Sequence, residues 1–363
     1  MRFVKLSLQN FRSYDFADWF PAPSINVICG PNGTGKTNMV EAVHFLALTK
    51  GFHPEKDALK SGERFFMLSG ELEGEETLRV ECNYLYGKGK KILHNGQKLD
   101  KLSVHVGRIP MVASTPEDTD LINEGGAGRR KWVDVMLCQA EPGYLSELSR
   151  YENALNRRNA LLESQRDGAS YDPEVFDYLT DALVRSGVEI QRFRATFMDD
   201  FLSDFVSSYR AVVGLSESCT AVYSPNIPLP EIDCWKKEAA NRRRSEAALG
   251  RTLFGIHRDD WFFFIDDKPA KNFGSQGQRK TFVLALKLAQ FAFLERRTGR
   301  KPILILDDVF DKLDPSRVSA VAKLISHSLD AQAFVTDADP VRARRAFSDA
   351  RFFSTENGHF LPV

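Results

Sequence analysis

The pattern of apolar and polar positions predicts strands at both ends of the chain and helices in its middle. Val4, Leu6 and Leu8 alternate with polar neighbours, as in a half-buried strand. Residues 24–29 form a short apolar run that predicts a buried strand, and residues 38–46 carry apolar side chains at helical spacing. This order of strand, loop and helix indicates an α/β fold.

Further strands follow this helix, and their spacing is typical of an antiparallel sheet. Residues 65–72 and 77–86 are predicted strands, and residues 109–113 form one more. Between them, Asn95-Gly96 predicts a tight hairpin because this pair suits a two-residue type I′ turn. Antiparallel strands at this point are unusual for a simple doubly wound fold, so we expect mixed sheets.

The middle of the chain has a helical pattern. Leu148, Leu155 and Leu162 recur every seven residues, and the pattern resumes at Phe176 after a break at residues 167–173. Two helices joined by a short polar turn predict an antiparallel helical hairpin. Arms of about 25 residues would reach roughly 40 Å, which is too short for a long coiled-coil arm.

Strand-like runs return near the end of the chain, at residues 261–265, 303–306 and 333–336, and Asn357-Gly358 predicts a terminal hairpin. A length of 363 residues exceeds what one hydrophobic core usually serves. We therefore predict a split head domain and an inserted helical domain. Their bounds are residues 1–115 and 251–363 for the head, and residues 116–250 for the insertion.

Composition narrows the class of protein. Hydrophobic and charged fractions of 43% and 27% are typical of soluble globular proteins. No uncharged run approaches the ~18 apolar residues of a membrane helix, and five scattered cysteines without a CxxC pair favour neither zinc nor disulfides. We expect a cytoplasmic protein without a membrane partner. Because the net charge is zero, any nucleic-acid surface must be a local patch.

The strongest chemical signal is a glycine-rich loop between the first buried strand and its helix. Such a loop and the helix N-terminus present backbone N–H groups to a phosphate chain. We expect Lys36 to reach the β- and γ-phosphates and Thr37 to bind Mg²⁺, so the loop predicts an ATP site. It matches G-x-x-x-x-G-K-[ST] and comprises Gly30, Pro31, Asn32, Gly33, Thr34, Gly35, Lys36 and Thr37, followed by Asn38.

A second half of this site is predicted far along the chain. Asp307 ends the apolar run at residues 303–306 and suits the Walker B carboxylate that holds Mg²⁺. Asp308 is then placed to polarise the attacking water. Two acids can also end a strand as a solvated turn, but the glycine loop makes the catalytic interpretation stronger. Because Lys36 and Asp307 are so distant in sequence, a large insertion must separate the two halves.

The helix that begins near Ser275 carries a third element. Ser275, Gly277 and Gln278 resemble the signature motif of ABC-type ATPases, and residues 310–314 resemble their D-loop. Ser275 also stands where an N-cap is expected. The ABC resemblance implies that this helix contacts the ATP of a second copy, in an ATP-dependent homodimer.

The chain as a whole resembles the RecF family, bacterial recombination-mediator ATPases related to SMC heads. Seven blocks match in order, at residues 10–14, 30–38, 115–118, 128–130, 255–260, 274–280 and 306–314. The resemblance implies an ABC/SMC-head-like ATPase fold and a weak, DNA-stimulated ATPase that binds gapped and other double-stranded DNA, and also single-stranded DNA. It also implies work with RecR and RecO to load RecA, and contact of Arg12 with the nucleotide phosphates.

Two positions depart from the general ABC pattern. Asp308 stands in place of the usual Glu, which fits slow turnover. Thr336-Asp337 follow the last buried strand where many ABC ATPases carry a switch histidine. Residues 114–118 are the best candidate for the junction between the two lobes of an ABC-like head.

Basic clusters leave two interpretations open. Arg242, Arg243 and Arg244 form a run with few acids nearby, and Arg129-Arg130 form another. Each would suit DNA phosphates, and each would equally suit a solvated helix face. For His257 we favour a structural role.

Three function classes remain. A DNA-binding switch ATPase is our prediction. A transporter ATPase is disfavoured by the missing switch histidine and by the helical insertion. An SMC-like head of another DNA-maintenance or nuclease system is the alternative, although a nuclease would need a further acidic cluster.

Overall fold

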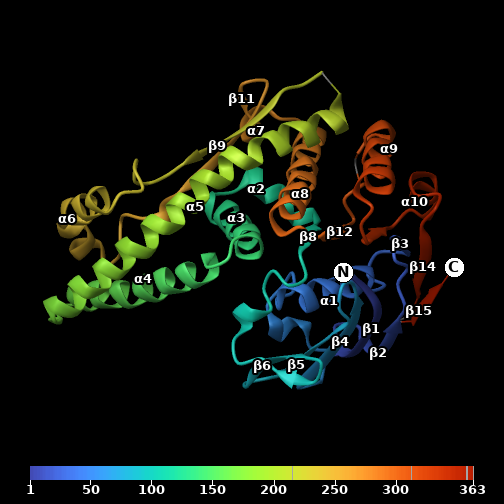
Figure 1. Ribbon diagram of the computed structural model, residues 1–363, viewed down its shortest axis with the longest axis horizontal. Helices are drawn as coiled ribbons and strands as arrows, with labels where there is room; N and C mark the ends of the chain where they lie inside the picture. The colour runs from blue at the N-terminus through green and yellow to red at the C-terminus, as the bar shows by residue number, and fades with distance from the viewer. Residues whose placement is uncertain (215, 312, 357–358, 363) are drawn as a thin grey trace. The chain divides into compact units, whose positions relative to one another are not determined.

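The structure is a computed structural model that describes residues 1–214, 216–311, 313–356 and 359–362. The chain forms two compact units, both drawn in Figure 1. Unit 1 comprises Met1–Thr119, Ser207–Glu217 and Gly274–Val363, and unit 2 comprises Asp120–Val206 and Ser218–Phe273. These units divide the chain after Thr119 and after Phe273 and include Ser207–Glu217 in unit 1, so their bounds differ from the predicted split at residues 116 and 250. As a statement about domains, the predicted split stays a prediction.

Unit 1 contains an antiparallel sheet of six strands in the order β2-β1-β4-β5-β6-β7. Its strands are β1 (Arg2–Phe11), β2 (Tyr14–Trp19), β4 (Phe65–Glu73), β5 (Leu78–Leu85), β6 (Gly89–His94) and β7 (Gln97–Lys98). The hairpin predicted from Asn95-Gly96 joins β6 to β7, and both turn residues have the positive φ that a type I′ turn requires, 49° and 81°. The prediction of an antiparallel insertion after the first helix is confirmed.

A second sheet of unit 1 has the order β15-β14-β3-β13-β12-β8. Its strands are β3 (Ile25–Cys29), β8 (Met111–Ser114), β12 (Ile303–Asp307), β13 (Ala333–Asp337), β14 (Arg351–Glu356) and β15 (His359–Pro362). All pairings are parallel except that of β14 with β15. Every residue of β3, β12 and β13 is buried, which explains their continuous apolar runs. The turn residues of the predicted terminal hairpin, Asn357 and Gly358, lie outside the described residues.

Helix α1 (Lys36–Leu48) lies between the two sheets and contacts strands of both, among them β4 and β12. In Figure 1 it is drawn in blue beside β1 and β4. Its apolar residues extend almost all the way round, as expected for a helix covered on two sides. The remaining helices of unit 1 are η1 (Glu55–Ala58), η2 (Leu102–Val104), η3 (Pro116–Thr119), α8 (Gln276–Thr298), α9 (Pro315–Lys323), η5 (Leu324–Leu329) and α10 (Pro340–Ala346).

Unit 2 is mainly helical. Its helices are α2 (Asp120–Asn123), α3 (Gly126–Ala140), α4 (Tyr144–Arg166), α5 (Pro173–Val213, with its end from Ser207 in unit 1), α6 (Ile232–Leu249), η4 (Ile256–Arg258) and α7 (Ala270–Phe273). A small antiparallel sheet has the order β11-β10-β9, with β9 (Cys219–Ser224), β10 (Asp260–Ile265) and β11 (Lys268–Pro269). Among the described residues, no helix has both the length and the apolar character needed to cross a bilayer.

The predicted helical hairpin is formed by α4 and α5. The two helices run antiparallel, because Tyr144 near the start of α4 contacts Arg194, whereas Arg158 near its end contacts Thr180. The break predicted at residues 167–173 falls between them. Helix α5 is longer than expected, with 41 residues, because its buried aromatic positions continue past the end of the paired segment.

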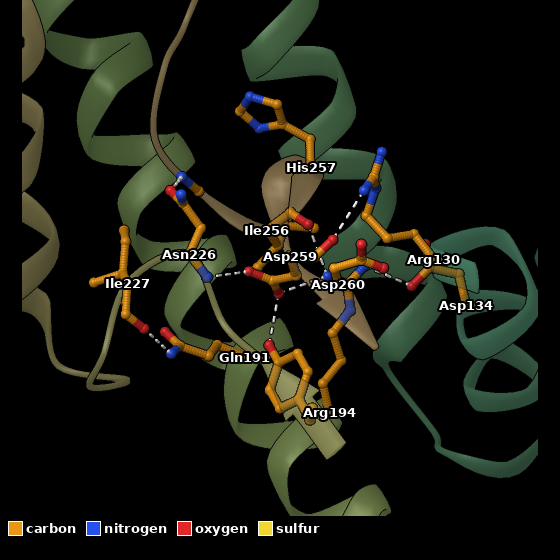
Figure 2. A network of polar contacts seen from close by, with 12 residues as sticks. Arg130, Asp134, Gln191, Arg194, Asn226, Ile227, Ile256, His257, Asp259 and Asp260 are labelled. Atoms are coloured by element: carbon orange, nitrogen blue, oxygen red, sulfur yellow. Dashed lines mark hydrogen bonds and ion pairs between the residues drawn. The ribbon is translucent and has the colours of Figure 1, made fainter. Parts of the chain in front are cut away.

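A buried ionic network holds the helices of unit 2 around η4. Asp259, which is 2% exposed, accepts hydrogen bonds from Arg194 at 2.8 Å, from the Tyr223 hydroxyl at 2.6 Å and from the Asn226 backbone N–H at 2.8 Å. Arg194 also donates to Asp134 of α3 at 2.8 Å, as Figure 2 shows. Burial raises the pKa of Asp259, and the positive charge of Arg194 opposes this rise. Four segments distant in sequence are thereby joined through two buried charges.

We predict that Asp259→Ala lowers the free energy of unfolding by about 3–5 kcal/mol, because it leaves Arg194 buried without its main counter-ion. Asp181→Ala is the matched control, since the Asp181 carboxylate is more exposed and pairs with Arg185 along one helix face. This variant should cost less than about 1 kcal/mol. Urea unfolding followed by circular dichroism measures both, and equal midpoints for the two variants would show that the network does not stabilise unit 2.

Candidate nucleotide-binding site

The glycine loop joins the end of β3 to the start of α1, as the sequence predicts. Gly35 is the N-cap of α1, with φ 101°, and no side chain caps this helix. The N–H groups of the first helical turn therefore remain available at the loop, where the helix dipole adds a partial positive charge. Backbone donors and dipole together suit a phosphate chain.

The turn at residues 10–14 braces the loop. The Tyr14 hydroxyl donates to the Gly35 carbonyl at 3.1 Å, and the Asn38 side chain donates to the Ser13 hydroxyl at 2.9 Å. A Cβ atom at Gly35 would lie 2.8 Å from the Ser13 hydroxyl oxygen, which is too close for any other residue. Glycine is thus required here both by its φ and by this close approach. A second brace comes from β14, since the hydroxyls of Thr34 and Thr355 are 2.7 Å apart.

Lys36 lies inside the loop and is only 6% exposed. Its ammonium group donates to the carbonyl oxygens of Gly30 at 2.8 Å and Pro31 at 2.9 Å. Burial lowers the pKa of Lys36, while the carboxylates of Asp308 and Asp307 oppose that change. The lysine is therefore held between the loop backbone and two acids, where a phosphate oxygen would be strongly attracted.

Thr37 and Asp307 meet although they are distant in sequence. The Thr37 hydroxyl lies 3.0 Å and 2.9 Å from the two carboxylate oxygens of Asp307, which is 3% exposed. Burial raises the pKa of Asp307, and hydrogen bonds from Thr336 and Thr37 oppose the rise. A hydroxyl and a carboxylate form the oxygen-only donor set that Mg²⁺ prefers. These two residues fit a Mg²⁺ ion held together with the phosphates of a nucleotide.

Asp308 adopts a left-handed backbone conformation, with φ 49°. Burial raises the pKa of Asp308, and the charges of Asp311 and Asp337 add to the rise. Its backbone N–H donates to the Thr336 hydroxyl at 2.9 Å, and this hydroxyl donates to Asp307 at 2.6 Å. Thr336 was not among the predicted site residues. The sequence signal that could have identified Thr336 was its position, where many ABC ATPases carry a switch histidine.

Arg12 is held by a buried carboxylate that sequence reasoning missed. Two guanidinium nitrogens of Arg12 donate to Glu41 at 2.7 Å and 2.8 Å, and a third donates to the Asp57 carbonyl at 2.7 Å. Glu41 is 1% exposed and also accepts from the backbone N–H groups of Phe52 and His53. The contact of Arg12 with nucleotide phosphates stays a prediction. The sequence signal for Glu41 was a carboxylate within the mainly apolar stretch of this helix.

The signature segment begins α8 with a capping box. The Ser275 hydroxyl accepts from the Gln278 N–H at 3.2 Å, and the Gln278 side chain accepts from the Ser275 N–H at 2.8 Å, which confirms the predicted N-cap. Ser275 is exposed, and a Cβ atom at Gly277 would meet nothing closer than 3.6 Å. The start of α8 thus has open space at Gly277 for a ligand outside it.

The D-loop is tied to this helix. Lys280 donates to the Asp311 carbonyl at 2.7 Å, and Arg317 of α9 donates to the Thr281 hydroxyl at 2.9 Å. Asp314 caps α9, as its Asp-Pro pair suggests. Lys312, which belongs to the same sequence block, lies outside the described residues. Residues 114–118 begin close to the acids, since Ser114 of β8 is aligned with Leu306 of β12, the residue before Asp307.

The predicted basic residues lie in unit 2. Arg129 is 6% exposed, and its guanidinium pairs with Asp260 at 2.7 Å and 2.9 Å and donates to two backbone carbonyls. Arg130 donates to the Asp259 carbonyl at 2.8 Å (Figure 2). This geometry favours a structural role for Arg129. His257 also makes a contact within unit 2, because its Nδ1 atom lies 2.7 Å from the Tyr151 hydroxyl.

The run at residues 242–244 lies on α6 with its side chains exposed. Arg242 pairs with Glu238 at 2.6 Å along the helix, and Arg243 pairs with Asp177 at 3.0 Å. No ion pair of Arg244 is found within the part of the chain that the structure describes. Exposed pairs of this kind are weak and can exchange for phosphate contacts.

Comparison with known proteins gives one consistent family. The model of the RecF/RecN/SMC N-terminal domain matches residues 2–359. The chain is 38% identical over 345 residues to the DNA replication and repair protein RecF of Flavobacterium johnsoniae, covering 94% of this chain and 95% of the relative. It is 34% identical over 365 residues to that of Cytophaga hutchinsonii, with coverages of 99% and 96%.

Solved structures agree with this fold. A structure of the recombination mediator protein RecF with ATP, from the RecFOR pathway, superposes with a TM-score of 0.90 at 24% identity, covering 99% of this chain and 97% of the other. An Smc head bound to the C-terminal winged-helix domain of ScpA superposes with a TM-score of 0.57 at 12% identity, with coverages of 100% and 97%. The ABC-like head fold with mixed sheets is confirmed.

We predict that Lys36→Ala weakens MgATP binding by more than about 100-fold, because charge-assisted contacts to the phosphates contribute several kcal/mol. Lys50→Ala is the control, since Lys50 is an exposed lysine just past the end of the same helix. Its affinity should match that of the wild type. Equilibrium titration with a fluorescent ATP analogue measures both, and wild-type affinity in Lys36→Ala would refute the assignment of the loop.

Proposed function

This chain belongs to the RecF/RecN/SMC N-terminal domain family, among the RecF proteins of DNA replication and repair, and we propose that it is an ATP-driven DNA-binding switch of recombinational repair. The observation that carries the proposal is the contact between Thr37 and Asp307. It brings the glycine loop and the carboxylate strand into one site, although the helical unit separates them in sequence.

The proposed chemistry divides among four side chains. Lys36 neutralises the phosphate chain, and Thr37 with Asp307 holds the Mg²⁺ ion that would offset charge on the transferred phosphoryl group. Asp308 orients the attacking water. An aspartate is one methylene shorter than the glutamate of most ABC ATPases, which agrees with slow hydrolysis. Slow hydrolysis would set how long the ATP-bound state lasts.

A second copy of the chain is the proposed partner of the signature helix. The exposed start of α8, with Ser275 and the open space at Gly277, suits a phosphate. In the ABC-like arrangement that phosphate belongs to ATP bound by the other chain. ATP binding would then close a two-fold dimer, and hydrolysis would open it.

We propose that the closed dimer binds double-stranded DNA, gapped duplex included, and also binds single-stranded DNA. Relatives named RecF and the RecFOR pathway support work with RecR and RecO, and therefore loading of RecA onto single-stranded gaps in the cytoplasm. Stimulation of a weak ATPase by DNA is part of this proposal. The alternative, an SMC-like head of another DNA-maintenance system, is less well supported, because the RecF–ATP structure is a far better match than the Smc head.

The dimer mechanism predicts complementation between two inactive variants. Ser275→Arg should leave ATP binding nearly intact but block ATP-dependent dimerisation, whereas Lys36→Ala should block both. When the two variants are mixed, the first brings a working loop and the second an intact signature helix, so one composite site forms in each heterodimer. ATP hydrolysis should therefore partly return. Full hydrolysis by Ser275→Arg alone would mean that the site is complete within one chain.

The DNA contact predicts a change in salt dependence. If Arg242, Arg243 and Arg244 contact phosphates, their triple replacement by Ala should make the slope of log affinity against log salt shallower by about 0.9 for each lost contact. Replacement of Arg185 and Arg192 by Ala is the control, because both are exposed and paired along α5. Fluorescence anisotropy with gapped duplex at several salt concentrations measures the slopes. An unchanged slope in the triple variant would place the DNA surface elsewhere.

A further inference from the structure

We propose that Thr336 is a positioning residue for ATP hydrolysis, which fixes Asp307 and Asp308 relative to each other through its one hydroxyl group. This inference rests on the proposed ATPase function. It concerns a buried residue whose hydroxyl contacts the two carboxylate-bearing residues beside it, and that acts through them.

Sheet topology places Thr336 at the centre of the site. Strand β13 lies between β3, which leads into the glycine loop, and β12, which ends in Asp307. In the parallel register Thr336 is aligned with Asp307 on one side and with Ile28 on the other. Thr336, one residue before the end of the middle strand, thus lies beside Asp307 and beside the strand that leads into the glycine loop, and the backbone pairing on both sides fixes where it lies.

The hydroxyl of Thr336 uses both of its hydrogen-bonding roles. It donates to a carboxylate oxygen of Asp307 at 2.6 Å and accepts from the backbone N–H of Asp308 at 2.9 Å. Thr336 is 1% exposed, so water does not readily replace either bond. Because a β-branched side chain in a strand has a restricted χ1, the oxygen is also fixed in direction. One atom therefore sets the orientation of the Mg²⁺-binding carboxylate and of the backbone that carries the next acid.

The backbone at Asp308 needs this support. Its φ of 49° is uncommon for a residue other than glycine, and it turns the chain sharply after the strand. Without an acceptor, the Asp308 N–H would lose its partner at a half-buried turn, which favours relaxation of the turn. A shift of the carboxylate by about 1 Å from its productive position can reduce a reaction rate by about 100-fold.

The residues after Thr336 hold the strand end from the other side. Asp337 is 1% exposed and accepts from two nitrogens of Arg342 at 2.9 Å and 2.6 Å, and from the Asp339 N–H at 2.7 Å. Asp337 and Thr336 together stand where many ABC ATPases carry a switch histidine. The end of β13 is therefore a fixed support, with Thr336 facing the two acids.

The test compares Thr336→Val with Thr336→Ser. Valine keeps the shape and loses both hydrogen bonds, and serine keeps the hydroxyl. We expect Thr336→Val to bind ATP within about threefold of the wild type and to lose at least about tenfold in the single-turnover rate of hydrolysis, whereas Thr336→Ser should regain most of that rate. Thr298→Val is the matched control, because the Thr298 hydroxyl donates to the Leu294 carbonyl of its own helix, in the same unit. Its rate should equal that of the wild type.

A double variant shows whether Thr336 acts through Asp308. If it does, the fold-loss in rate caused by Thr336→Val should be smaller in the Asp308→Asn background than in the wild type, because only the effect through Asp307 remains. A wild-type rate in Thr336→Val, or a full additional loss in the double variant, would overturn the inference while the ATPase function stands. Absence of hydrolysis in the wild type would instead overturn the proposed function, and this inference with it.

Discussion

The contact between Thr37 and Asp307 depends on one constraint, the strand order of the parallel sheet in unit 1. Strands β3 and β12 are separated by the whole of unit 2 in sequence, yet only β13 lies between them in the sheet. Parallel strands end at the same edge, so the loop after β3 and the acids after β12 meet there. The continuous burial of β3, β12 and β13 supplies the apolar contact that holds this order. A charged substitution within these strands would disturb the site without touching it.

Two sets of hydrogen bonds hold the site residues in place at this edge of the sheet. From the antiparallel sheet, the turn at residues 10–14 supports the loop through Tyr14 and Ser13, and its Arg12 is fixed by the buried Glu41. From the parallel sheet, Thr336 links the two acids. Strands of both sheets contact α1, so the loop at the start of this helix is supported from both sides. This explains why a loop rich in glycine can be held in one conformation.

Sequence alone predicted the parts of this structure that depend on local pattern. The strands at residues 25–29 and 303–307, the Asn95-Gly96 hairpin and the Ser275 cap each follow from a few adjacent residues. Strand β2 was not predicted although its partner β1 adjoins it in sequence, because residues 14–19 do not alternate strictly between apolar and polar positions. The length of α5 was not predicted because the end of this helix packs on partners far away in sequence, such as Phe282. For the same reason Glu41 and Thr336 were missed, and the buried pairing of Arg129 with Asp260 could not be anticipated from a basic run. Burial and pairing are properties of the folded chain.

The central claim is that ATP joins two copies of this chain and that hydrolysis separates them. Light scattering of the wild-type protein with Mg²⁺ and no nucleotide, with ADP, and with a slowly hydrolysed ATP analogue tests this claim most directly. We expect the molar mass of one chain, 41.0 kDa, in the first two conditions and twice that mass with the analogue. The same molar mass in all three conditions would contradict the account.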